Sequence, residues 1–151
     1  MRKMIYGLLI VVSVIFIGAC GNKENKEAEV QSDIDLTGLS GTMLYSAIYD
    51  IMMEPEDYLG KTIKIEGQFT VFPDEQSDEN RYAVIIADAS ACCEQGIMFT
   101  LAGEHTYPDD YPEPEDDITV VGEFKLYNEG EYFYYYLGES EILPERSSNL
   151  N

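Results

Sequence analysis

The stretch "KTIKIEGQFTVF", residues 61–72, alternates apolar and polar side chains around a central glycine. Neighbouring side chains of a strand point to opposite faces, so Ile63, Ile65 and Phe69 share one apolar face. The pattern predicts a half-buried strand. Gly67 in its middle predicts a bulge or a sharp bend.

The flanking sequence predicts one helix and four further strands. "TMLYSAIYDIMM", residues 42–53, places apolar residues at helical spacing, and Pro55 disfavours continuation of the helix. "RYAVIIADA" and "GIMFTLAG" predict two strands. "DITVVGEFKLYNEGEYFYYYLGESEIL", residues 117–143, predicts two more, with Gly122 in mid-strand and a turn at residues 128–130. We therefore expect a mainly β fold, a small five-stranded antiparallel OB-like barrel preceded by one short helix.

The N-terminal segment "MRKMIYGLLIVVSVIFIGAC" has the charged, apolar and small-residue regions of a secretory signal. Its apolar run is shorter than the ~20 residues that a membrane-spanning helix needs, so an uncleaved anchor is the weaker interpretation. The last four residues, 17–20, resemble the bacterial lipobox, which implies that Cys20 is diacylated and becomes the new N-terminus. We predict a lipoprotein held on the extracytoplasmic face of the cell membrane by two acyl chains.

The chain is predicted to divide into four parts. Residues 1–19 are the predicted lipoprotein signal peptide. Residues 20–35 are the lipidated cysteine and a disordered spacer, because they hold many charges and almost no large apolar residues. Residues 36–144 form the predicted OB-like barrel domain, and residues 145–151 a disordered tail.

The charge of the chain limits its partners. It has a formal net charge of −20, and removal of the signal peptide with Arg2 and Lys3 leaves 7 basic residues against 29 acidic ones. Nucleic acids are bound mainly through cationic neutralisation of phosphates, so no nucleic-acid partner is expected. Anionic phospholipid surfaces are disfavoured for the same reason, and we expect the membrane to be contacted through the lipid anchor.

Cys92 and Cys93 are adjacent in a predicted turn. A bridge between them would be strained, because adjacent Cα atoms lie ~3.8 Å apart and disulfides usually need ~4.4–6.8 Å. Three interpretations stay open: small packing residues, a soft-metal site for zinc or copper, or a redox centre. His105, the only histidine of the chain, is expected at the other end of the third strand.

Two other features suggest binding. Tyr132, Tyr134 and Tyr136 share one face of the predicted last strand, which is either core or a contact patch. The acidic loop "GEHTYPDDYPEPEDD", residues 103–117, lacks the spacing of an EF-hand calcium loop. We interpret it as a solvated loop.

The stretch "ADASACCEQGIMF", followed later by "VVGEF", resembles the soluble C-terminal domain of the YcgQ-type permease-subunit family. It is also similar to small Gram-positive lipoproteins that carry this domain alone. The resemblance covers roughly residues 55–143, and its distinctive part is the run at 88–93 with Gly96. It implies a membrane-linked role in transport or metal handling. The chain has no membrane-spanning bundle like that of two-part family members, so a permease function is not carried over.

The sequence contains no recognisable catalytic set. It has a single histidine, no Gly-x-Ser-x-Gly elbow and no phosphate-binding loop. We predict a non-enzymatic, lipid-anchored OB-like module that binds a protein or small ligand, a membrane protein being one candidate partner. The alternative is a zinc- or copper-binding accessory module that uses Cys92 and Cys93 and is linked to transport. No other cofactor is predicted.

Overall fold

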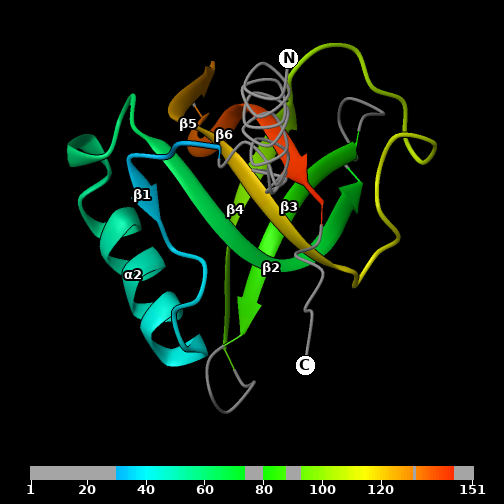
Figure 1. Cartoon of the computed structure of the whole chain (residues 1–151). Helices are drawn as coiled ribbons and strands as arrows, with labels where there is room; N and C mark the ends of the chain where they lie inside the picture. The colour runs from blue at the N-terminus through cyan, green and yellow to red at the C-terminus, as the bar shows by residue number, and fades with distance from the viewer. Residues whose placement is uncertain (1–29, 74–79, 88–92, 131, 145–151) are drawn as a thin grey trace, which may run out of the picture.

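The computed structural model of the chain describes residues 30–73, 80–87, 93–130 and 132–144 (Figure 1). The predicted signal peptide, Cys20, most of the predicted spacer, Cys92 and the predicted tail from residue 145 lie outside the described residues. No helix in the described part is both long and apolar enough to cross a membrane.

The described residues form one α-helix, one 3-10 helix and six strands. In chain order these are β1 (Ile34–Asp35), α2 (Gly41–Met53), η2 (Pro55–Asp57), β2 (Thr62–Pro73), β3 (Asn80–Ala87), β4 (Glu94–Leu101), β5 (Asp117–Glu129) and β6 (Tyr132–Leu143). The predicted mainly β fold with one short helix is confirmed. The predicted five antiparallel strands are wrong, because β1 is a sixth strand and the sheet is mixed: β1 lies parallel to β2, and β4 parallel to β6.

Strand β1 lies in the last two residues of the stretch predicted to be a spacer. Backbone hydrogen bonds on either side of it, Asp33 N to Thr62 O at 2.9 Å and Leu36 N to Lys64 O at 2.8 Å, join it to β2. Burial acts to raise the pKa of Asp35, but hydrogen bonds from Thr37 and Lys64 and the charge of Lys64 outweigh it and lower that pKa. Two residues of the predicted spacer, Ile34 and Asp35, thus belong to the sheet.

The strands close into a ring of pairings. β2, β3 and β4 follow one another as antiparallel neighbours, β5 returns to pair with β2, and β6 lies between β4 and β5. β2 is long and curved (Figure 1), and it pairs with β5 over Thr62–Gln68 and with β3 over Gln68–Pro73. Its register with β5 is unbroken at Gly67, where an added Cβ would lie 2.6 Å from the Ile85 carbonyl oxygen. Gly67 therefore permits a close approach of strands where β2 changes partners.

The β5–β6 hairpin turns later than predicted. Asn128 pairs with Phe133 and Glu129 with Tyr132, so the connection is residues 130–131 and not 128–130. Gly130 has φ +64, which a residue without a Cβ adopts at little cost. The register shifts around Gly122, the glycine in the middle of β5, which makes it a bulge.

The apolar core lies inside the ring, and the two sides of the ring are covered differently. Leu44, Ile48 and Ile51 of α2 are buried in this core. The loop of residues 102–116 lies on the opposite side of the strands from α2 (Figure 1). Tyr107 and Tyr111 of that loop pack against the core from there.

Candidate binding pocket

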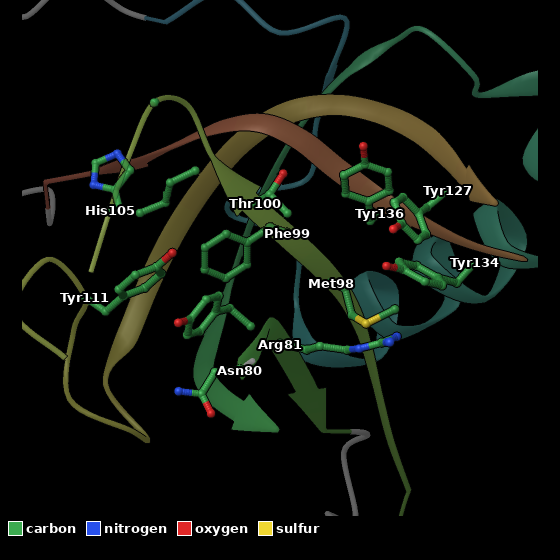
Figure 2. Close-up of a pocket in the computed structure, with 13 residues that line it drawn as sticks. Asn80, Arg81, Met98, Phe99, Thr100, His105, Tyr111, Tyr127, Tyr134 and Tyr136 are labelled. Carbon is green, nitrogen blue, oxygen red and sulfur yellow. The ribbon is translucent and has the colours of Figure 1, made fainter. Parts of the chain in front are cut away.

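A cavity of about 400 Å³ lies where the start of β3, the end of β4, the 102–116 loop and the β5–β6 hairpin meet (Figure 2). Its volume falls in the ~300–1,000 Å³ range of small-molecule sites. We call this cavity the aromatic pocket. Figure 2 shows His105 and Tyr111 at one end of it and Tyr127, Tyr134 and Tyr136 at the other.

The first wall of the aromatic pocket is a cluster of three tyrosines from the β5–β6 hairpin. Tyr127 pairs with Tyr134 across the two strands, and their ring centroids lie 4.8 Å apart. Tyr136, two residues further along the same face, contacts both rings edge-on at 6.2 and 6.1 Å. The Arg81 guanidinium lies 5.1 Å from the centroid of Tyr134, a cation–π distance. Of Tyr132, the first residue of the predicted contact patch, the structure describes the backbone alone.

The second wall is formed by Tyr82, Phe99 and Tyr111 above the ring of Phe69. Tyr82 and Tyr111 stack with their centroids 4.0 Å apart, and Phe69 stacks with them at 6.1 and 6.0 Å. Arg81 and Tyr82 are consecutive in β3, so their side chains point to opposite faces. The aromatic pocket is therefore lined by side chains from both faces of the sheet, with Arg81 on the outer face and Tyr82 on the face inside the strand ring.

The 102–116 loop is tied down at both ends. Ala102 N donates to Ser140 O at 3.0 Å, and at the far end Phe69 N donates to Asp116 O at 2.8 Å while Glu115 N donates to Phe69 O at 2.9 Å. The acidic side chains of this loop are exposed, in keeping with a solvated loop, but its tyrosines pack inward. The second wall is thus fixed in place by backbone hydrogen bonds.

The polar groups of the aromatic pocket are mostly neutral. The pKa of Tyr111 is raised to about 12, mainly by burial and then by the charge of Tyr82, a hydrogen bond with Tyr82 and the charge of Asp110. The Tyr111 hydroxyl therefore keeps its proton at neutral pH. His105 Nε2 donates to Ala102 O at 2.8 Å, because a carbonyl can only accept. Arg81 is the one permanent charge among the described lining residues, none of which is Asp or Glu although the chain has 29 of them.

Cys93 is remote from His105 along β4. Cys93 is exposed and directly precedes this strand, and His105 follows its end. The eight residues of β4 span about 26 Å at ~3.3 Å each. Within the described ranges no group of three or more His, Cys, Asp or Glu side chains is placed to hold a metal ion. Since Cys92 lies outside those ranges, the metal and redox roles of the pair stay predictions.

Sequence reasoning found only part of the aromatic pocket. Tyr134 and Tyr136 were recognised from their alternation, and both line it. The predicted turn at residues 128–130 begins two residues before the observed one, so it does not place Tyr127 opposite Tyr134. Tyr82 and Tyr111 come from a core-facing strand position and from an irregular loop, which no periodic pattern links.

Comparison with known proteins adds no relative from which a role could be taken. No family model, curated protein or solved structure matches this chain. The chemistry of the aromatic pocket therefore has to follow from its own residues.

Proposed function

We propose that this chain is a non-enzymatic binding module, built on an OB-like barrel, that engages a small ligand or a protein at its aromatic pocket. The strand order supports the barrel. β2, β3 and β4 are consecutive antiparallel neighbours, and β5 returns by a long connection to lie beside β2, which is the Greek-key arrangement. An OB fold is a partly open, five-stranded Greek-key barrel. β1 is then an addition outside the five barrel strands.

The position of the pocket supports a binding role. In OB folds the face of the second and third strands, with the neighbouring loops, binds ligands. If β2 is counted as the first barrel strand, these are β3 and β4, which contribute residues from Asn80 to Tyr82 and from Met98 to Leu101 to the lining. The correspondence between these strands and those of an OB fold is one of fold alone.

The observation that carries the proposal is the gathering of aromatic side chains around one cavity in a strongly acidic chain. Tyrosine offers a large amphipathic surface with little side-chain entropy to lose on binding. The loop that holds Tyr111 is already tied to Phe69 and Ser140, so little further ordering is needed when a ligand enters. The aromatic pocket therefore has the features of a preorganised binding site.

We further propose that the module is attached to the extracytoplasmic face of the cell membrane through lipid on Cys20. The support comes from the sequence of residues 1–20, with its signal-like regions and lipobox-like end. A tethered module could present its pocket to a membrane protein or to a small ligand outside the cell. The net charge of −20 argues against a nucleic-acid ligand.

Calorimetric titration of the full-length protein tests the binding role. The probes are short oligosaccharides of neutral, anionic and cationic type, a set of small aromatic acids and amines, and a single-stranded oligonucleotide that should not bind. We expect at least one probe other than the oligonucleotide to bind to the wild type and to Tyr49→Ala, a control on the exposed face of α2. Tyr136→Ala should weaken this binding by about tenfold or more. Binding that Tyr136→Ala leaves unchanged, or no binding by any probe, would contradict the proposal.

A further inference from the structure

We infer that the aromatic pocket binds a neutral oligosaccharide. This inference rests on the proposed binding function and names the class of ligand. It follows from three properties of the described lining: its charge, its mixture of rings and neutral polar groups, and its extent across β4.

The charge of the lining disfavours ionic ligands of either sign. An anion would be repelled by a chain with net charge −20. The one guanidinium among the described lining residues, that of Arg81, already lies over the ring of Tyr134. A cation would find no carboxylate among the described lining residues and would meet Arg81. Transfer of an unpaired charge out of water is costly, so a neutral ligand fits best.

The chemistry of the lining disfavours a purely apolar ligand. Tyr127, Tyr134, Tyr136, Thr100 and Asn80, whose side chains carry hydroxyl or amide groups, line the same cavity as the purely apolar Phe99. An apolar ligand would bury such groups without offering hydrogen bonds, which is unfavourable. A sugar ring has a C–H face that packs on an aromatic ring and hydroxyls at its edge that can donate and accept. It therefore matches both kinds of surface at once.

The extent of the pocket favours an oligomer over a single sugar. Its two aromatic walls, around Tyr134 and around Tyr111, lie on opposite sides of the end of β4 (Figure 2). The cavity of about 400 Å³ runs between them. A chain of linked sugar rings could pack one ring on each wall, whereas a single ring could contact only one.

A matched set of trisaccharides tests this class. Chitotriose is neutral, and its fully deacetylated form, the glucosamine trimer, has the same backbone with three amines. Cellotriose and maltotriose are further neutral probes, and trigalacturonate is the anionic one. Binding to the full-length protein is measured by isothermal titration calorimetry up to about 10 mM, ten times a ~1 mM dissociation constant. The protein is kept in a phosphocholine detergent, because maltoside headgroups are themselves neutral disaccharides.

We expect at least one neutral trimer to bind, and the charged trimers to bind about tenfold more weakly or not at all. Tyr136→Ala should weaken binding by about tenfold, as expected when an aromatic contact is lost, and Tyr136→Phe, which keeps the ring, by less. Tyr49→Ala should bind like the wild type. Thermal unfolding followed by circular dichroism checks that each variant is folded, and Tyr127→Ala is a second test of the same wall should Tyr136→Ala fail to fold.

Two results would overturn the inference. If a charged trimer binds more tightly than every neutral one and Tyr136→Ala weakens that binding, the proposed binding role stands and the ligand class is wrong. If no neutral trimer binds while an aromatic acid or amine does so at this site, the class is again wrong and the binding role again stands. Failure of all probes would contradict both proposals.

Discussion

Replacement of Phe69 tests whether the ring beneath the second wall supports the aromatic pocket. Phe69 is fully buried, and its ring centroid lies 6.0–6.2 Å from those of Tyr82, Phe99 and Tyr111. Replacement of a buried phenylalanine by alanine costs about 3–5 kcal/mol, from lost transfer energy and the cavity left behind. Small domains unfold with a free energy of about 5–15 kcal/mol, so Phe69→Ala should remove a large fraction of the stability.

The substitution separates side-chain support from backbone anchoring. The backbone N–H and carbonyl of Phe69 bond to Asp116 and Glu115, and a side-chain change leaves these groups in place. Phe69→Leu keeps most of the apolar contact but loses the ring contacts, so we expect a smaller cost of about 1–2 kcal/mol. Both variants should also weaken ligand binding, because Tyr82 and Tyr111 lose the ring beneath them.

Urea-induced unfolding followed by circular dichroism measures these costs. The matched control is Phe133→Ala, because the side chain of Phe133 is 67% exposed and its loss should change the free energy of unfolding by no more than about 0.5 kcal/mol. A cost below about 1.5 kcal/mol for Phe69→Ala would refute the idea that this ring is a tightly packed support. A cost equal to that of Phe133→Ala would refute it equally.

Three further outcomes are expected. The pKa of Tyr111 in the folded protein, about 12, lies above the ordinary tyrosine pKa of 10.0, so the stability gained from its neutral hydroxyl should be complete below pH 10 and lost as the pH rises toward 12. Urea unfolding of wild type and Tyr111→Phe at pH 8, 10 and 11 should show a steeper loss of stability in the wild type, and parallel losses would argue against the raised pKa. Labelled fatty acid should be incorporated into the full-length protein and not into Cys20→Ser, and equal labelling of both would exclude this lipidation site. Alkylation without denaturant, followed by mass spectrometry, should modify the exposed Cys93 faster than Cys92, and equal rates would show that the two thiols are equivalent.

The strands could be predicted from the sequence wherever side chains alternate over enough residues. This alternation predicts β2 and β5, since each strand buries alternate residues over a long stretch. β1 could not be predicted in this way, because two residues carry no period and its parallel pairing with β2 depends on chain that lies far from it in the sequence. The parallel pairing of β4 with β6 could not be predicted for the same reason, since it joins Met98 to Tyr136, far apart in the sequence.

The aromatic pocket was only partly predictable for a related reason. Alternation identifies which residues of one strand share a face, and it found Tyr134 and Tyr136. It says nothing of the residues that close packing brings there from elsewhere, such as Arg81 over the ring of Tyr134 or Tyr111 stacked on Tyr82. These contacts depend on how the ring closes and on where the 102–116 loop is tied.

Closure of the strand ring has a consequence for how the protein folds during synthesis. Residues Thr62–Gln68 of β2 pair with residues 117–123 of β5. β2 is therefore synthesised well before the strand that it pairs with. Pairings between residues so distant in sequence are slow to form. At ~5–20 residues per second, an emerging chain holds α2 and the β2–β4 meander for several seconds before β5 and β6 can complete the ring. During that interval both outer edges of the meander present unpaired backbone groups, and a chain truncated before β5 would keep them open to pairing with other chains.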